Sequence, residues 1–429
     1  MKMKHWLIGL LLFSSLDAKQ HSLKIDDLVK IALKHSPDID SSHLDFKGAE
    51  QRTKLAKGFY LPRLDLNVNA GKQWSKLKHQ SRGNIDILAG QLGASQLLYD
   101  FGKTAGRVSS SKQESLALQA QMQQVISDKI FLVKKNYYDI LKIKSIMDVQ
   151  RKNVKLQKQQ LHRAKKYLES GIKTIIDVSD AQVRVEQAEL DLKNAQYELE
   201  LQRAKLEETM GYVPYNGNYV VYSKKLSLNG LSRKLPLVRT PLSQLESFAY
   251  KHRYVLQSSQ HIVKSARSNV KISQADYSPS ISLTGDYSLQ HVDSSAVAVM
   301  PESQGQIGIN MSWNLFSGYQ TDASVQEAKI AVLKAASQVQ GVKLAIKKQV
   351  LDSHISVRRS KDNVKLYESI SKASLKKFEQ AQKRYENELS DYVELQDAQQ
   401  GYIQSLSDLV NTYYDYFIAL SQLDHAVGR

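Results

Sequence analysis

The fold is decided by the stretch Gly58-Phe-Tyr-Leu-Pro-Arg-Leu-Asp-Leu-Asn-Val-Asn69, which is followed further along by Leu97-Leu-Tyr-Asp-Phe-Gly102. Its features recur in Ala275-Asp-Tyr-Ser-Pro-Ser-Ile-Ser-Leu-Thr-Gly-Asp286 and in Trp313-Asn-Leu-Phe-Ser-Gly318. Pro62 and Pro279 lie 217 residues apart, and so do Leu98 and Leu315. A fixed offset between two stretches of this length indicates a tandem duplication.

The same offset extends well beyond these stretches. It pairs His35 with His252, and it pairs Asp180-Ala-Gln182 with Asp397-Ala-Gln399, without any insertion. The chain therefore divides into a first repeat over residues 19–211 and a second over 242–429, joined by a linker at 212–241. Each repeat is interpreted as half of one body with two-fold pseudo-symmetry.

Two strands are predicted in each repeat, over about 63–71 and 85–99 and over about 280–290 and 306–316. Apolar and polar residues alternate there with period two, which is typical of a sheet with one apolar face. The polar residues 72–83 read as a loop between the first two strands. Pro62 and Pro279 mark the junctions where a helix ends and a strand begins, because proline cannot continue a helix.

Long coiled-coil helices are predicted after the strands. No proline occurs between Thr104 and Tyr212, nor from Glu302 to the end of the sequence. Apolar residues recur at intervals of seven, which predicts helices that supercoil against one another. The three series are Ile126, Val133, Ile140, Met147, Val154, Leu161 and Leu168; Val178, Val185, Leu192, Leu199 and Leu206; and Leu395, Tyr402, Leu409, Tyr416 and Leu423.

Composition narrows the class of protein. The 429 residues include no cysteine, which excludes disulfides, thiolate metal sites and cysteine nucleophiles. The net charge of +17 is spread along the chain without a dense basic run, which favours solvated helix faces over nucleic-acid binding. Residues 1–18 read as a secretory signal peptide, with Lys2 and Lys4 before a short apolar core, so we expect an exported protein.

The number of strands implies oligomerisation if the strands enter a membrane. A sheet in lipid must close into a barrel, because open edges leave backbone groups without partners. Four strands are too few to close alone. Two chains would give eight strands and a barrel filled by side chains, and three chains would give twelve, enough for a wet lumen. The alternative is a soluble sheet with one buried face, which gives no reason for such long paired helices.

These residues resemble the TolC-type family of outer-membrane channel-tunnel proteins over essentially the whole mature chain. The resemblance implies a mixed α+β membrane protein, mainly α, that forms a homotrimer with a 12-stranded barrel in the outer membrane and a 12-helix tunnel in the periplasm. It also implies a passive, gated exit duct for efflux or type I secretion, with a periplasmic adaptor protein and an inner-membrane ABC or proton-driven transporter as partners. The motifs that carry it are Tyr60-Leu-Pro62, Tyr277-Ser-Pro279, Leu98-Tyr-Asp-Phe-Gly102, Leu315-Phe-Ser-Gly318, Gly171-Ile-Lys-Thr-Ile-Ile-Asp177 and Asp391-Tyr-Val-Glu394-Leu-Gln-Asp397.

The resemblance also implies a site at the periplasmic entrance. Glu394 and Asp397 match an acidic ring, and Asp177 and Tyr385 match an entrance latch whose arginine position is Ser390 here. This departure leaves the charged half of the latch absent or supplied elsewhere, by Lys173 or Arg384. The expected adaptor-docking turns are formed by Gly171, Ile172, Glu388 and Leu389.

Enzyme chemistry is not expected. The eleven histidines are scattered, and no zinc-protease, serine-hydrolase or phosphate-loop motif is present, so no catalytic residue, metal or cofactor is predicted. Two other classes remain as alternatives. An exported structural coiled coil or adhesin would be water-soluble and extended, and a periplasmic adaptor would need a compact β-domain between its helices. The sequence does not identify the exported substrate.

Overall fold

The computed structural model describes residues 21–75, 83–172, 174–214, 219–294 and 302–429, so the predicted signal peptide lies outside the described residues. The chain forms two compact units. Unit 1 comprises Met1–Pro37, Ile126–Ser247 and Gln349–Arg429, and unit 2 comprises Asp38–Val125 and Phe248–Lys348. The units therefore do not coincide with the two sequence repeats, because each unit combines segments from both repeats.

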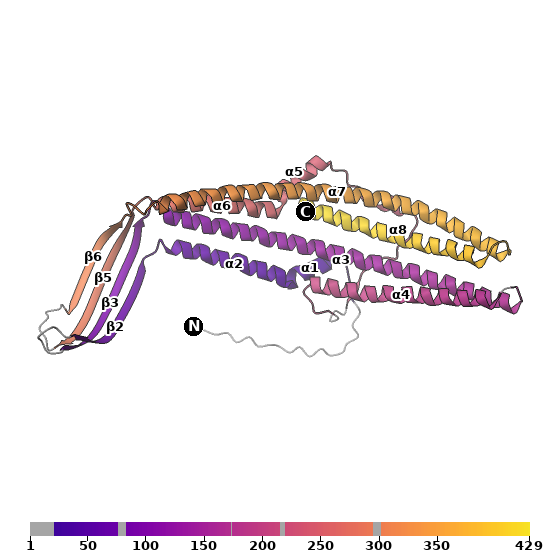
Figure 1. The fold of residues 1–429 in the computed structure, drawn as a ribbon, viewed down its shortest axis with the longest axis horizontal. Coiled ribbons are helices and arrows are strands. Elements are labelled where there is room, and N and C mark those ends of the chain that lie inside the picture. The colour runs from indigo at the N-terminus through magenta and orange to yellow at the C-terminus, as the bar shows by residue number, and fades with distance from the viewer. Residues whose placement is uncertain (1–20, 76–82, 173, 215–218, 295–301) are drawn as a thin grey trace. The chain divides into compact units, whose positions relative to one another are not determined.

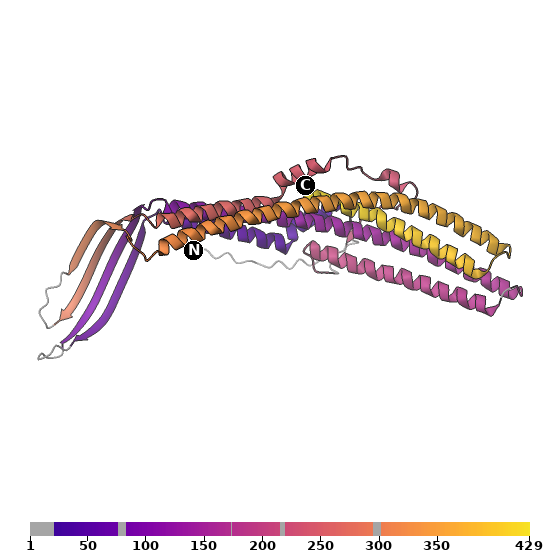
Figure 2. The same cartoon turned by 45° about the horizontal axis from the view of Figure 1, so that its top comes forward.

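Unit 2 contains a four-stranded antiparallel sheet. Its strands are β2 (Arg63–Ser75), β3 (Gly83–Tyr99), β5 (Ser280–Ser294) and β6 (Ser303–Ser312), in the order β2-β3-β5-β6 (Figure 1). Residues 72–75 were predicted to belong to a loop. This was wrong, because β2 continues to Ser75, which pairs with Gly83. The turned view shows the same strand order (Figure 2).

One row of apolar side chains on this sheet is exposed. Leu64, Leu66 and Val68 of β2 expose 65–71% of their surface, and Ile307 and Ile309 of β6 expose 71–79%. These residues alternate with polar ones, so they lie on one face of the pleat. An exposed apolar row of this extent marks a surface that contacts another protein or a membrane.

Equivalent hydrogen bonds fix both helix-to-strand junctions. The helices α2 (Pro37–Gly58) and α6 (Tyr254–Ala275) end shortly before β2 and β5. The Gln96 side-chain nitrogen donates to the Tyr60 carbonyl oxygen at 2.8 Å, and the Trp313 indole nitrogen donates to the Tyr277 carbonyl oxygen at 3.0 Å. Trp313 was expected within the last strand, but β6 ends at Ser312 and the indole turns to this junction instead.

The long helices α3 (Lys103–Glu169) and α7 (Gln320–Glu386) start from matching turns. Two successive residues have positive φ in each turn, Phe101 and Gly102 in one and Gly318 and Tyr319 in the other. A side chain caps each helix start. At the start of α3, the Asp100 carboxylate accepts a hydrogen bond from the Thr104 backbone nitrogen at 2.7 Å. At the start of α7, Ser317 Oγ accepts one from the Thr321 backbone nitrogen at 3.4 Å.

Unit 1 consists mainly of two helical hairpins. In one, α3 turns into α4 (Ile175–Thr209), and in the other, α7 turns into α8 (Tyr392–Val427); both turns lie at the same end of the unit (Figures 1 and 2). Helix α1 (Ile25–His35) and part of α5 (Leu242–His252) also belong to this unit. The linker contains two elements that the sequence did not predict, the strand β4 (Tyr219–Val221) and the short helix η1 (Leu231–Lys234). Strand β4 pairs in parallel with β1 (His21–Leu23).

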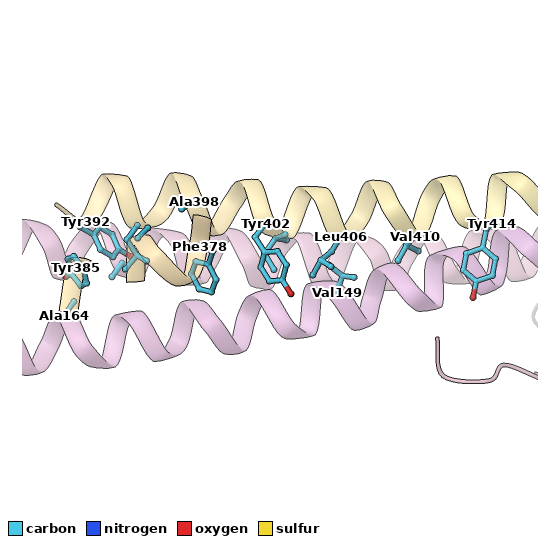
Figure 3. Packing of buried hydrophobic residues seen from close by; sticks show 14 residues of the cluster. Val149, Ala164, Phe378, Tyr385, Tyr392, Ala398, Tyr402, Leu406, Val410 and Tyr414 are labelled. Carbon is cyan, nitrogen blue, oxygen red and sulfur yellow. The ribbon is translucent and has the colours of Figure 1, made fainter. Parts of the chain in front are cut away.

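The core of unit 1 follows the heptad positions of α8. All five residues of the series Leu395, Tyr402, Leu409, Tyr416 and Leu423 are at most 5% exposed. Figure 3 shows Tyr392, Tyr402, Leu406 and Tyr414 along α8, with Phe378 of α7 and Val149 of α3 packed beside them. None of the helices among the described residues is long and apolar enough to cross a membrane.

The turns at the ends of α3 and α7 have the same geometry. The Ile172 nitrogen donates to the Tyr167 carbonyl at 2.9 Å, and the Leu389 nitrogen donates to the Arg384 carbonyl at 2.8 Å. Gly171 has φ of 72° and Glu388 has φ of 61°. This arrangement is the glycine-type helix C-cap, and in the second copy glutamate occupies the left-handed position that favours glycine.

We predict that Glu388→Gly stabilises unit 1 by about 0.5–1 kcal/mol, because glycine adopts the left-handed conformation without a steric cost. Glu379→Gly is the matched control, since Glu379 is exposed inside α7 and glycine there costs about 1 kcal/mol. Thermal unfolding should show a higher midpoint for the first variant and a lower midpoint for the second. A lower midpoint for Glu388→Gly would contradict this account of the turn.

Candidate functional site

The residues predicted for the entrance lie in unit 1, where the two hairpins turn. Asp177 is in the first turn of α4, and Glu394 is at the equivalent place in α8. The Asp177 carboxylate accepts hydrogen bonds from the Thr174 backbone nitrogen and Oγ1, both at 2.9 Å. The Glu394 nitrogen donates to the Asp391 carboxylate at 2.8 Å. Helix capping therefore fixes the start of both short helices.

Tyr385 lies in the last turn of α7 and is only 2% exposed. Its ring is 6.1 Å from that of Tyr167 on α3 and 5.9 Å from that of Tyr392 on α8. Burial raises the pKa of Tyr385 to about 12, and the negative charge of Asp177 adds to this effect. The negative charge of Asp177 thus acts on the buried Tyr385 hydroxyl, which stays protonated at neutral pH.

The structure describes Ser390 and Arg384, two of the three residues considered for the charged half of the latch. Ser390 is half-buried, and Lys173 lies outside the described residues. Arg384 donates to the Leu389 carbonyl at 3.3 Å, and its Nε lies 3.6 Å from Glu394 Oε1. Arg384 therefore links the end of α7 to the start of α8 within one hairpin and does not join the two hairpins.

A different arginine joins the hairpins. Arg163 Nη1 of α3 donates to Glu386 Oε1 of α7 at 2.5 Å. A hydrogen bond from Gln382 lowers the pKa of Glu386, and the positive charge of Arg163 lowers it further, so this carboxylate is ionised at neutral pH. Both side chains are more than one third exposed, at 36% and 39%, so solvent screens the pair.

Sequence reasoning missed Arg163 and Glu386. The one available signal was a difference between the repeats, because Gln380 occupies the position equivalent to Arg163 in the second copy. Nothing local distinguishes these residues from other charged residues on a coiled coil.

Of the predicted acidic pair Glu394 and Asp397, Glu394 has a basic side chain nearby. Asp397 is exposed, one helical turn from Glu394, so both carboxylates lie on one side of α8. Glu394, however, has Arg384 within ion-pair distance, which reduces the local negative charge. Within the described part of the chain, no group of three or more His, Asp or Glu side chains is arranged to hold a metal ion.

Comparison with known proteins gives the same architecture. The family model described as outer membrane efflux protein matches residues 28–212 and 247–429. Outer membrane protein TolC of Vibrio cholerae is 23% identical, with 98% of this chain and 95% of that protein covered. Alkaline protease secretion protein AprF of Pseudomonas aeruginosa is 20% identical, covering 99% of this chain and 88% of that protein.

Among solved structures, the outer membrane protein VceC of Vibrio cholerae superposes with a TM-score of 0.80 at 19% identity, covering 94% of this chain and 96% of that one. The two segments matched by the family model fall one on each side of the linker, as the duplication requires. They also contain both hairpins and all four strands of the sheet. The chain belongs to the outer membrane efflux protein family.

Proposed function

We propose that this outer-membrane export duct is a homotrimer with a 12-stranded barrel and a 12-helix periplasmic tunnel. The sheet supports the barrel, because β2 and β6 are its edge strands and its exposed apolar row suits lipid. Three copies supply twelve strands and close the edges that one copy leaves open. The channel is passive and carries out no chemistry on its cargo.

Exposed apolar stripes on unit 1 support the assembly of three chains. Ile176, Val183, Leu190 and Tyr197 recur every seven residues on α4, and each is 52–67% exposed. Leu351, Ile355, Leu366 and Ile370 form a second exposed stripe along one side of α7. Heptad spacing on an exposed face is the pattern of a helix that packs against another helix. A head-to-tail contact between the two stripes closes into a ring.

The hairpin turns are proposed as the docking sites for a periplasmic adaptor. Each turn presents one exposed apolar residue just after its left-handed position, Ile172 at 47% and Leu389 at 68% exposure. Equivalent turns on both hairpins give two similar docking sites in each chain. The adaptor would connect the duct to an inner-membrane ABC or proton-driven transporter, and that transporter would select the cargo.

The observation that carries the gating part of the proposal is the Arg163–Glu386 bridge between the hairpins. The latch consists of this ion pair together with Tyr385 and Asp177, and it holds the entrance closed. Next to it, Glu394 and Asp397 of three chains would place six carboxylates around one axis. Such a ring favours cations.

The trimer proposal predicts that Val183→Asp combined with Leu190→Asp gives monomers, because each substitution would bury an unpaired charge in the contact between chains. Gln182→Asp is the control for each single substitution, since it adds one negative charge on a different side of α4. Light scattering of the purified protein in detergent should report trimers for the control and monomers for the double variant. Trimers of the double variant would exclude this stripe as the contact.

The latch proposal predicts that Arg163→Gln raises the open-to-closed ratio about two- to fivefold, since a partly exposed ion pair contributes up to about 1 kcal/mol. Arg151→Gln is the control, because Arg151 pairs with Asp148 of its own helix at 2.7 Å. Single-channel conductance in planar bilayers measures the ratio. Tyr385→Phe should also raise closed-state current. If Arg163→Gln behaves like the control, the bridge does not gate the entrance.

The acidic-ring proposal predicts that Glu394→Gln with Asp397→Asn moves the cation-to-anion permeability ratio severalfold towards unity. Asp180→Asn is the control, because Asp180 is exposed at the equivalent position of the first repeat. Reversal potentials under a salt gradient give the ratio. An unchanged potential in the double variant would show that these carboxylates do not line the permeation path.

A further inference from the structure

A cavity of about 650 Å³ lies in unit 1, away from the entrance. One wall is formed by the segment that we call the strap, residues 222–230, which connects β4 to η1. The other walls come from α3, α7 and α8. A volume of this size accommodates a small organic ligand.

The interior of the cavity is largely apolar. The strap contributes Leu226 and Leu228, which pack against the core cluster of unit 1. The helices contribute four further apolar side chains, Val149, Leu375, Leu406 and Val410. Figure 3 shows Val149 and Leu406 side by side, with the ring of Tyr402 next to them. An alkyl chain lying against these side chains would be shielded from water on that side.

Hydrogen bonds hold the strap at both ends. At its start, Tyr137 OH donates to the Tyr222 carbonyl at 3.2 Å. At its end, the Glu368 carboxylate accepts from the Gly230 nitrogen at 3.0 Å and from the Ser232 nitrogen and Oγ at 3.1 and 2.7 Å. The wall is therefore formed before any ligand arrives, which reduces the entropic cost of binding.

Charges at the cavity favour an anion. It is lined by Arg151, Lys152, Lys225 and Lys372, against the carboxylates of Asp148 and Glu368. Although burial opposes ionisation, hydrogen bonds from Ser232, Lys372 and Gly230 lower the pKa of Glu368 to about 2, so its charge is already matched by donors. Lys152 is likewise engaged, donating to Tyr402 OH at 2.7 Å, and Arg151 pairs with Asp148 at 2.7 Å. Lys225 takes part in none of the ion pairs seen among the described residues.

We propose that this cavity binds a single-chain anionic amphiphile, with its carboxylate at Lys225 and its alkyl chain against Leu226, Leu228 and Leu406. The site goes beyond the export function. Its α7 residues, Glu368 to Leu375, face away from the apolar stripe of α7, so a trimer built on that stripe leaves the cavity accessible.

The test uses decanoate carrying a photoreactive diazirine at its alkyl end, with decanol of the same design as the uncharged probe. The purified full-length protein, in a nonionic detergent, is irradiated with each probe and labelled peptides are quantified by mass spectrometry. We expect the carboxylate probe to label the strap and the facing segments of α3 and α8 severalfold more than decanol does. Lys225→Glu should reduce this labelling about fivefold, as expected for loss of one partly exposed ion pair.

Lys224→Glu is the matched control, because Lys224 is the exposed neighbour of Lys225 and does not line the cavity. It changes the net charge equally and should leave the labelling unchanged. Equal labelling by the acid and the alcohol would overturn the proposal, and so would equal loss of labelling in the two lysine variants. Labelling spread over the sheet strands β2, β3, β5 and β6 would overturn it as well. Circular dichroism of each variant confirms that the helices are intact, and the readout does not depend on channel activity.

Discussion

Burial of a single apolar seam along α8 is the interaction on which unit 1 depends. Its residues recur every seven positions from Leu395 to Leu423, and Leu395 and Tyr416 are completely buried. Each such side chain stabilises the fold by roughly 1.5–3 kcal/mol on burial, which exceeds what any exposed ion pair of the bundle contributes. The seam also positions the linker, because the Tyr416 hydroxyl donates to the Pro236 carbonyl. The helix hairpins, the strap and the turns at the entrance therefore all rest on the same packing.

The duplication gives both repeats the same local structures, and the repeats differ in their charges where the hairpins turn. Both repeats share the side-chain bond at the helix-to-strand junction, the double positive-φ turn before the long helix, and the left-handed cap at its end. They differ at the entrance, where Arg163 of one repeat meets Glu386 of the other, while Gln380 replaces the arginine in the second copy. Because Gln380 stands at the position of Arg163, the reciprocal ion pair with Glu169 cannot form, and the charged contact is made by one repeat only.

The sequence predicted the features that depend on local periodicity. The heptad positions of α8 are buried, and the family resemblance is confirmed by the family model. It did not predict the contacts that depend on tertiary geometry. Arg163 and Glu386 are 223 positions apart and have no local signature, and the anchoring of the strap by Glu368 spans 136 or more. Asp177 was expected only as a latch, yet it first caps its own helix. The sequence analysis also missed the exposed stripe on α4 from Ile176 to Tyr197. An exposed apolar stripe and a buried one both repeat every seven residues, so the period alone does not distinguish them.

We propose that the salt bridge between Arg163 and Glu386 holds the entrance closed. Reversing the charges tests it most directly, since Arg163→Glu with Glu386→Arg restores the attraction with the two charges exchanged. Single-channel recordings should show raised closed-state current in each single variant and near wild-type current in the combined one. A combined variant that leaks as much as the single variants would contradict the claim, because only a direct pairing of these two side chains predicts rescue.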